Sequence, residues 1–529
     1  MVERPCHKRE TMMDKIVMHA RNKPTVLVLT ILLAVTGVQC RRRRPNIVFI
    51  LTDDQGYNDI GYRGSEFPTP NLDALAEAGV KLENYYVQPI CSPSRSQLMS
   101  GKYQIHTGLQ HDVIGTCEPR GLPLGSPTMP DILQEQGYAT HAIGKWHLGF
   151  FKEEYTPLRR GFDTFFGILP SGSFHYSYKA CAKAEVNGSI NVYCGYSLRD
   201  MDTPYLSGNG TYSTHLYTQK AVQRIQEAAD SDKPMFLYLA YTAPHFPLEA
   251  PEEYYRDFTN IANFDRKVFA GMMSTVDEGV KNITDALKSY GLWDNTILIY
   301  SSDNGGEPSY GGSNWPLRGT KSTLWEGGLK TVGFVNSPLI RPHRRGKISN
   351  ELMHISDWFP TISAMAGISL KRSLDLDGVN QWPMIRGGKP GRRTELLHNI
   401  DIAAPMQGSP LFNDTFDTRI RAALRVGKYK LLTGNPGNGT WYPRTTPAEG
   451  FGKSNRWQAF DSNAKNVWLY NVARDPRETT DLSDAMPGKV REMLDRLAMY
   501  NATALAPWNP AADPNCDPDQ HGGIWEPWL

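Results

Sequence analysis

The chain has 529 residues, of which 40% are hydrophobic and 21% are charged, and its formal net charge at pH 7 is +2. This composition is typical of a globular protein and excludes an intrinsically disordered one. So small a net charge gives no basic excess for binding nucleic acid, and a chain of this length favours two domains over one.

Residues 1–40 have the pattern of a signal peptide. Basic residues precede an apolar run from Val26 to Val38, and small residues follow it up to Cys40. A membrane anchor is the alternative, but the run is shorter than the roughly 20 residues that span a bilayer. We therefore expect a cleaved leader, no transmembrane segment later in the chain, and a solvated arm at residues 41–44.

Sequons and cysteines fit a secretory route. Candidate glycosylation sites, each in an Asn-x-Ser/Thr sequon without a central Pro, are Asn187, Asn209, Asn282, Asn413, Asn438 and Asn501. Cys6 and Cys40 lie in the leader, which leaves an odd number of cysteines in the mature chain: Cys91, Cys117, Cys181, Cys194 and Cys516.

If Cys91 is set apart, the other cysteines can form disulfides. Cys181 and Cys194 are close enough to close a small loop, and Cys117 would then pair with Cys516. Four cysteines allow about three pairings, and the sequence does not choose among them.

Buried strands alternate with helices over most of the chain. Strands are predicted at residues 46–52, 139–144, 235–241 and 296–302, and a helix at 69–79. This alternation predicts an α/β fold with a largely parallel central sheet between helices. After about residue 395, a hairpin at 420–432 and a helix at 488–500 predict a smaller α+β domain with an antiparallel sheet, so we expect a catalytic domain at 41–395 and a second domain at 396–529.

Polar residues follow the ends of the four predicted strands. Each alone would be a turn, a cap or a surface charge, but the carboxyl ends of strands in an open α/β sheet form its ligand-binding edge. We therefore expect these residues to meet at one site: Asp53, Asp54, Lys145, His147, His245, Asp303 and Asn304.

The Asp and Asn residues of this set are oxygen donors, and no Cys or His cluster with zinc spacing accompanies them. Oxygen-only ligation suits a hard cation such as Ca²⁺ or Mg²⁺. Lys145 and His147 are two residues apart, so in an extended segment they would face the same side. With Lys321 as a further cation, the set suits the binding of a compact oxyanion.

Residues 91–95 read Cys-Ser-Pro-Ser-Arg. Pro93 suits the first turn of a helix, which would place Cys91 at a helix N-terminus, where free backbone N–H groups favour anions. The alternative is a buried structural thiol or a disulfide partner.

Together these segments resemble the sulfatase family of the alkaline-phosphatase-like superfamily. The matching segments are Thr52-Asp-Asp-Gln-Gly-Tyr57, the C-x-P-x-R motif from Cys91 to Arg95, Gly144-Lys-Trp-His-Leu-Gly149, Pro244-His245 and Ser302-Asp-Asn-Gly-Gly306. Within the family, the chain is most similar to the arylsulfatase B branch, the N-acetylgalactosamine-4-sulfatases. It lacks cysteines that vertebrate members of this branch use for extra disulfides, which leaves its full disulfide set open.

The resemblance implies two additions to the chain. Cys91 would be oxidised to 3-oxoalanine (formylglycine) by the formylglycine-generating enzyme. One Ca²⁺ per subunit would be bound by residue 91 together with Asp53, Asp54, Asp303 and Asn304.

The resemblance also implies roles for the remaining residues. The hydrated aldehyde of residue 91 would attack sulfur, and Arg95 would favour its deprotonated form. Lys145 and Lys321 would hold the sulfate oxygens, while His245, assisted by Lys321, would bind sulfate and protonate the departing sugar oxygen. His147 would take the proton that lets the aldehyde re-form and sulfate leave.

The implied activity is removal of the 4-sulfate from N-acetylgalactosamine residues of dermatan sulfate and chondroitin sulfate. The implied location is the lysosome, reached by the secretory pathway, with secretion or the cell surface as alternatives. Two other interpretations are a related arylsulfatase acting on another sulfated glycan, and an inactive secreted glycan-binding protein on a sulfatase scaffold. A phosphatase is disfavoured, because phosphatases of this superfamily usually carry Ser or Thr as the nucleophile and bind two metals.

Overall fold

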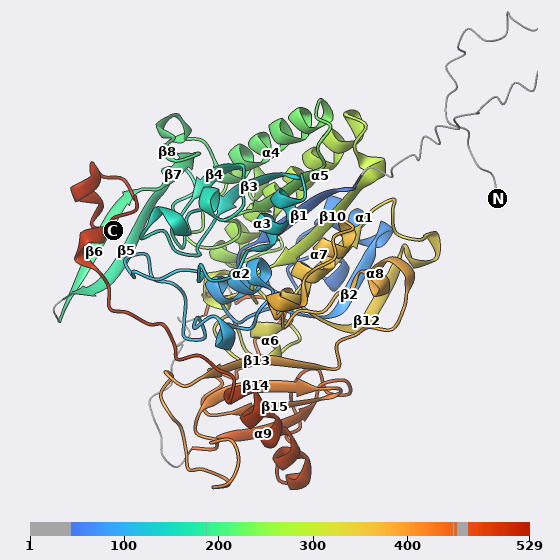
Figure 1. The fold of residues 1–529 in the computed structure, drawn as a ribbon, viewed down its shortest axis with the longest axis vertical. Coiled ribbons are helices and arrows are strands. Elements are labelled where there is room, and N and C mark those ends of the chain that lie inside the picture. The colour runs from blue at the N-terminus through green and yellow to red at the C-terminus, as the bar shows by residue number, and fades with distance from the viewer. Residues whose placement is uncertain (1–43, 187, 448, 452–463) are drawn as a thin grey trace, which may run out of the picture. The chain divides into compact units, whose positions relative to one another are not determined.

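A large mixed sheet organises the fold (Figure 1). The structure is a computed structural model that describes residues 44–186, 188–447, 449–451 and 464–529; the predicted leader and Asn187 lie outside these residues. The strands of the large sheet, in spatial order, are β12 (Lys347–His354), β2 (Val80–Tyr86), β11 (Gly333–Asn336), β10 (Thr296–Ser302), β1 (Asn46–Thr52), β9 (Met235–Ala240), β3 (Ala139–Lys145), β4 (Thr164–Ile168), β7 (Leu198–Asp200) and β8 (Thr203–Pro204).

The middle of this sheet is parallel. Strands from β10 to β4 run in one direction, whereas β11, β7 and β8 pair antiparallel with their neighbours. The sequence predicted β1 and β10 with their observed bounds, and β3 and β9 to within one residue. The prediction of an α/β fold with a largely parallel central sheet is confirmed.

Helices cover both faces of the sheet, which explains why β1 is buried along its whole length. Ile47, Phe49 and Leu51 pack in the core with α2 (Cys91–Ser100), α3 (Met129–Glu135) and α7 (Trp358–Met365). Val48 and Ile50 point to the opposite core, beneath α1 (Pro70–Ala78), α4 (Ser213–Ala229) and α5 (Phe264–Ser289). Two short helices, α6 (Glu326–Leu329) and α8 (Trp382–Gly387), lie in later connections.

A smaller antiparallel sheet follows, and a helix packs against it. Its strands are hydrogen-bonded in chain order, and their core includes residues of the helix. The prediction of a small antiparallel sheet with one helix is confirmed. Residues 44–529 form one compact unit, and the domain division at residue 395 stays a prediction. These elements are β13 (Glu395–Asp401), β14 (Arg421–Val426), β15 (Tyr429–Thr433), β16 (Val467–Asn471) and α9 (Pro487–Asn501).

Two disulfides are present, and they have one of the pairings that the sequence left open. Cys181 pairs with Cys194 across a separate hairpin of β5 (Lys179–Val186) and β6 (Ser189–Tyr196). Cys117 pairs with Cys516, 399 residues later, so the C-terminal tail returns to the large-sheet part of the chain. Cys91 is a free, buried cysteine, as the odd count required.

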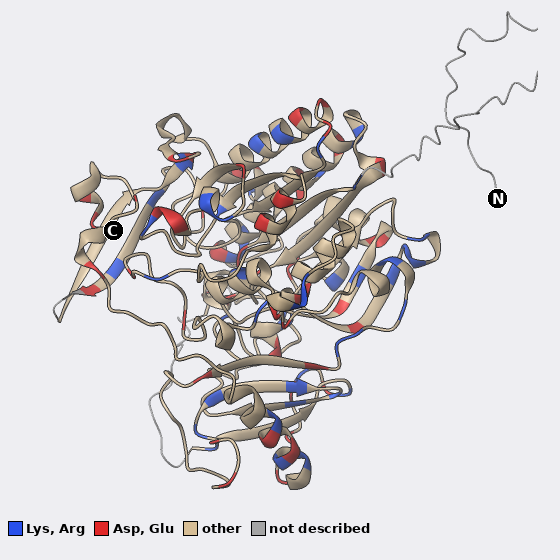
Figure 2. Cartoon of the chain, viewed as in Figure 1, with Lys and Arg blue, Asp and Glu red and all other residues tan. Residues whose placement is uncertain are grey.

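The surface carries mixed charge and several sequons. Figure 2 shows acidic and basic residues interspersed along α4 and α5, in line with the small net charge. Asn209, Asn282 and Asn413 are exposed, and Asn438 and Asn501 are half-buried, so glycosylation stays a prediction for each. Among the described helices, none has both the length and the apolar character required to cross a membrane.

Candidate active site

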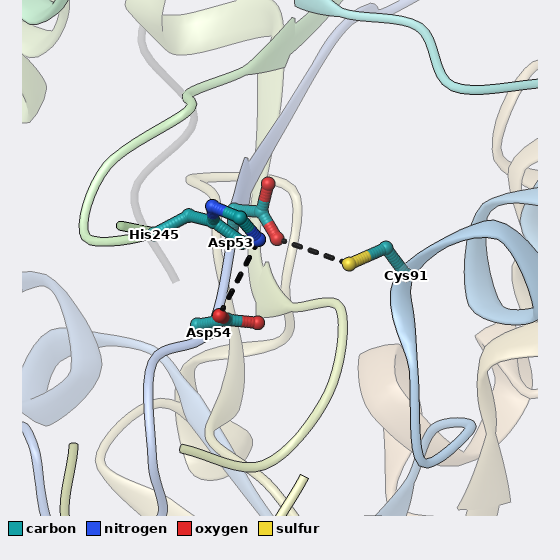
Figure 3. A group of neighbouring side chains, drawn as sticks. All are labelled: Asp53, Asp54, Cys91 and His245. Atoms are coloured by element: carbon teal, nitrogen blue, oxygen red, sulfur yellow. Dashed lines mark hydrogen bonds and ion pairs between the residues drawn. The ribbon is translucent and has the colours of Figure 1, made fainter. Parts of the chain in front are cut away.

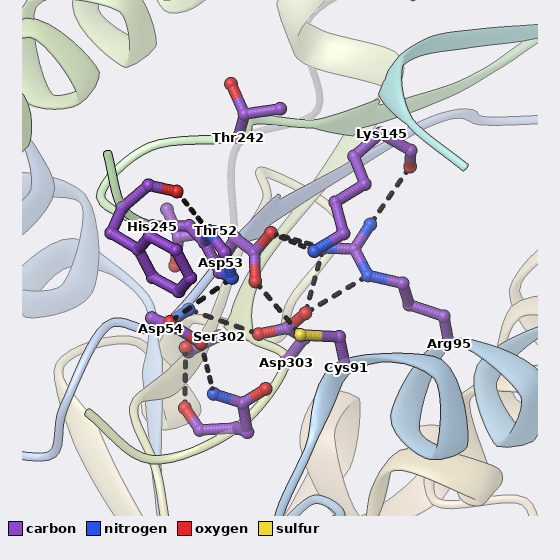
Figure 4. A network of polar contacts seen from close by, with 12 residues as sticks. Thr52, Asp53, Asp54, Cys91, Arg95, Lys145, Thr242, His245, Ser302 and Asp303 are labelled. Carbon is purple, nitrogen blue, oxygen red and sulfur yellow. Dashed lines mark hydrogen bonds and ion pairs between the residues drawn. The ribbon is translucent and has the colours of Figure 1, made fainter. Parts of the chain in front are cut away.

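Most of the predicted site residues meet at the carboxyl ends of the parallel strands, as Figures 3 and 4 show. Asp53 and Asp54 follow β1, Lys145 ends β3, and Asp303 follows β10. His245 lies in the loop after β9, and the start of α2 faces these residues from the other side. The structure therefore brings together residues that lie up to about 250 positions apart, as hydrogen bonds between Asp54 and the β10 loop show.

Cys91 is the first residue of α2, as the position of Pro93 predicted. Its side chain is buried, and its Sγ donates to Oδ1 of Asp53 at 3.4 Å. Burial, with the nearby Asp53 carboxylate, raises the pKa of the Cys91 thiol to about 12. Because the thiolate is the reactive form of cysteine, an unmodified Cys91 is a poor nucleophile at neutral or acidic pH.

Two ammonium groups neutralise the paired aspartates. Nζ of Lys145 lies 2.5 Å from Oδ2 of Asp53, and Nζ of Lys321 lies 2.5 Å from Oδ1 of Asp54. All four side chains are buried. Burial alone raises the pKa of Asp53, but Lys145 and further cations outweigh it and hold that pKa well below its ordinary value.

A third cation faces a third carboxylate. Arg95 donates from Nε and Nη2 to Oδ2 of Asp303, at 3.1 and 2.8 Å, and its Nη1 donates to the carbonyl oxygen of Lys145 at 2.9 Å. Arg95 thereby connects α2 to the ends of β3 and β10. Burial, with Asp53 close by, raises the pKa of Asp303 to about 7.

The donor set fits a divalent cation. Asn304 donates from Nδ2 to Oδ1 of Asp54 at 2.7 Å, while its Oδ1 is buried and has no hydrogen-bond partner among the described residues. Buried polar atoms are nearly always paired, so an unpaired buried oxygen indicates a missing partner such as a metal ion. Ligand atoms of Asp53, Asp54, Cys91 and His245 lie within 4.8 Å of one another. Carboxylate and amide oxygens are the donors that hard cations prefer.

His245 is held so that one ring nitrogen faces the carboxylates. Its Nδ1 lies 2.5 Å from the carbonyl oxygen of Phe246, which can only accept, so Nδ1 carries the hydrogen. Nε2 lies 3.7 Å from Oδ2 of Asp54 (Figure 3). Burial lowers the pKa of His245 to about 4. No sequence pattern predicts the flanking aromatic stack, in which the ring centroid of Phe246 lies 4.5 Å from that of His245 and 4.4 Å from that of Tyr310.

The expectation of an extended segment from Lys145 to His147 is wrong. The strand ends at Lys145, and His147 has a φ of 57°, in the left-handed region. The buried imidazole instead places Nε2 3.1 Å from the carbonyl oxygen of Ile114. Burial, with Lys145 and Arg95 nearby, lowers the pKa of His147 well below its ordinary value. His147 thus belongs to the site, but by a different local geometry.

Known proteins share this architecture over most of the chain. Arylsulfatase J of Mus musculus is 47% identical over 495 residues, which are 92% of this chain and 80% of the relative. N-acetylgalactosamine-6-sulfatase of Homo sapiens is 28% identical over 493 residues, which are 88% and 87% of the two chains. The crystal structure of Ps i-CgsB in complex with k-i-k-neocarrahexaose is 28% identical, covers 89% of this chain and 95% of its own, and superposes with a TM-score of 0.72.

A family model described as Sulfatase matches residues 45–368. This range contains the C-x-P-x-R motif, all the strand ends described above and Lys321. The match spans more than half of the chain and agrees with the identity to arylsulfatase J. The chain therefore belongs to the sulfatase family, whose members hydrolyse sulfate esters.

Proposed function

We propose that this sulfatase removes the 4-sulfate from N-acetylgalactosamine residues of dermatan sulfate and chondroitin sulfate. Sulfatases generally use formylglycine and a divalent metal. In this chain residue 91 would carry the formylglycine, and Ca²⁺ would be held by residue 91 with Asp53, Asp54, Asp303 and Asn304. We further propose that the protein reaches the lysosome through the secretory pathway.

The observation that carries the chemistry is the buried cluster of carboxylates and cations around Cys91. The thiol that starts α2 contacts Asp53, and the amide oxygen of Asn304 is buried without a partner among the described residues. A bound Ca²⁺ would supply positive charge there. An aldehyde hydrate at residue 91 offers two hydroxyl groups, one to bond sulfur and one to expel the sulfate afterwards, whereas serine would be left with a stable ester.

The buried cations and histidines of the site would each have a separate role in the reaction. Lys145 and Lys321 are buried cations that can bind sulfate oxygens. His245 presents Nε2 to the site and, once that nitrogen is protonated, can donate the proton to the departing sugar oxygen. His147 can accept the proton whose loss releases sulfate.

The substrate rests on the resemblance to the N-acetylgalactosamine-4-sulfatases and on the names of two relatives. One relative is named as an N-acetylgalactosamine-6-sulfatase, and a structural relative was solved with k-i-k-neocarrahexaose. Both names support a sugar as the substrate, and the first names a sulfatase acting on one. They leave the position of the sulfate group to experiment.

The modification is tested by mass. In protein secreted from eukaryotic cells, the tryptic peptide 82–95 should weigh about 18 Da less than its unmodified sequence, because a thiol becomes an aldehyde. The same preparation should release sulfate from a chromogenic aryl sulfate. Cys91→Ala is the matched control, and it should show neither property while keeping the wild-type fold by circular dichroism. An unshifted peptide together with no released sulfate would contradict the enzyme and favour an inactive glycan-binding protein.

The substrate is tested with two oligosaccharides that differ only in the position of the sulfate. Chondroitin fragments ending in N-acetylgalactosamine 4-sulfate should lose sulfate, and the matched 6-sulfate fragments should not. Activity on the aryl sulfate with neither fragment cleaved would favour another sulfated glycan as the substrate and would leave the sulfatase chemistry intact.

A further inference from the structure

His147 is oriented by a backbone carbonyl group. Because the carbonyl oxygen of Ile114 can only accept, Nε2 of His147 carries the hydrogen, and in the neutral ring Nδ1 carries the lone pair. Nδ1 is buried and has no hydrogen-bond partner within the described part of the chain. Such unpaired buried nitrogens are rare and mark catalytic groups or absent partners. The Ile114 carbonyl therefore determines which nitrogen can accept a proton.

Ile114 is itself held by the residue next to Cys91. Its backbone N–H donates to Oγ of Ser92 at 3.1 Å. Ser92 is buried in the first turn of α2. A single peptide segment thus connects the start of α2, through Ile114, to the imidazole of His147.

The C-terminal tail, residues 502–529, fastens the segment that contains Ile114. The N–H of Trp508 donates to the carbonyl oxygen of Gly108, and the N–H of Asp513 donates to that of Cys117, both at 2.8 Å. The disulfide from Cys117 to Cys516 closes the same contact three residues after Ile114. In Figure 1 the tail leaves α9 and runs back toward β5 and β6.

A buried arginine connects the tail and the segment that contains Ile114 by hydrogen bonds. Arg120 donates from Nη1 to the carbonyl oxygen of Trp508 at 2.8 Å, and from Nη2 to that of Val113 at 2.5 Å. Val113 directly precedes Ile114. The position of the Ile114 carbonyl is therefore determined from both sides, by Ser92 in α2 and by the tail.

We propose that Ser92 and the disulfide-linked C-terminal tail are positioning elements for His147, acting through the Ile114 carbonyl. The inference rests on the proposed function, in which His147 accepts a proton from the remaining hydroxyl group of sulfated residue 91. Loss of that proton re-forms the aldehyde C=O bond, the C–O bond to the sulfate breaks, and sulfate leaves with the bonding electrons. Misplacing the imidazole should slow this second step and spare the first.

The test uses Ser92→Ala, which removes the acceptor for the Ile114 N–H, and the double variant Cys117→Ala/Cys516→Ala. Rates with an aryl sulfate are normalised to the fraction of residue 91 converted to aldehyde. The ratio kcat/KM reports the steps up to the departure of the aryl alcohol and should stay within about twofold of the wild-type value. The turnover number kcat includes the release of sulfate and should fall about tenfold or more. Rapid mixing should show a burst of about one aryl alcohol per converted site before the slower steady state.

Matched controls separate positioning from general damage. Ser96→Ala removes another buried α2 hydroxyl, which donates to the Pro93 carbonyl, and Cys181→Ala/Cys194→Ala removes the other disulfide. Both should turn over like the wild type, without a burst. A parallel fall of kcat and kcat/KM, or unchanged kcat, in Ser92→Ala overturns the inference alone. A fully converted wild-type enzyme that releases no aryl alcohol overturns the proposed function as well.

Discussion

At the scale of single residues, the site balances buried charges in matched numbers. Asp53, Asp54 and Asp303 each face a cation, and burial makes every one of these groups costly to leave unpaired. Asn304 differs, because its amide oxygen has no partner among the described residues. A cation bound there would give this oxygen its missing partner and would stabilise the folded chain.

Calcium should therefore raise the thermal stability of chelator-treated protein. A ligand that binds only the folded state stabilises it by about 2.7 kcal/mol at about 100 times its dissociation constant, which predicts a rise of several degrees in Tm. Asn304→Ala should lose most of this calcium-dependent rise. The measurement is differential scanning calorimetry with and without calcium.

Asn399→Ala is the matched control for this prediction. Asn399 is also buried, also donates from its Nδ2 and also has an Oδ1 without a partner among the described residues, but it lies in β13, away from the carboxylates. Its variant should keep the full calcium-dependent rise in Tm. An equal rise in the Asn304 and Asn399 variants would contradict a metal site that includes Asn304.

At the scale of elements, local patterns predicted the parts that are buried on both sides. Runs such as Asn46–Thr52 and Thr296–Ser302 are mostly apolar and are buried at every position, because helices cover both faces of the sheet, so their bounds could be predicted directly. The left-handed turn at His147 and the stack of Phe246 on Tyr310 could not be predicted, since they depend on contacts between loops far apart in the chain. The site's residue types follow from motifs, whereas their orientation follows from tertiary packing.

A buried ion-pair cluster joins the small antiparallel sheet to α6. Nζ of Lys430 in β15 lies 3.0 Å from Oε1 of Glu326 in α6 and 2.9 Å from Oε1 of Glu478, all with almost no exposed side-chain surface. Lys430→Met should destabilise the protein by about 3–5 kcal/mol, because two carboxylates stay buried without their cation. Lys465→Met, which removes a half-exposed pair with Asp481, should cost about 0–1 kcal/mol.

The effect of Lys430→Met should depend on pH. Burial raises the pKa of Glu478 to about 7, from an ordinary value of 4.5. A carboxyl group with a raised folded-state pKa contributes stability when protonated, and this contribution is lost as pH rises through about 7. The loss is greater without Lys430, because Lys430 favours the charged form of Glu478. The destabilisation should therefore be larger at about pH 8 than at about pH 5 in guanidinium titrations of variant and wild type. Equal losses at the two pH values would contradict the assignment.

At the scale of the whole molecule, one covalent link spans most of the described chain. The Cys117–Cys516 disulfide closes a loop of 399 residues, whereas Cys181–Cys194 closes one of 13 within a hairpin. The tail that the long link holds also contributes backbone hydrogen bonds to segments of the large-sheet part, at Gly108 and Tyr196. The long link therefore restricts the unfolded chain far more than the short one and secures more native structure.

Removing the long link should cost more stability than removing the short one. Loop-closure entropy gives about 6 kcal/mol for the long loop and about 3 kcal/mol for the short one, as upper values. Cys117→Ala/Cys516→Ala should accordingly lower Tm more than Cys181→Ala/Cys194→Ala, in scans made at one rate and one calcium concentration. A hairpin variant that loses as much stability as the long-link variant, or more, would show that local strand pairing outweighs closure of the long loop.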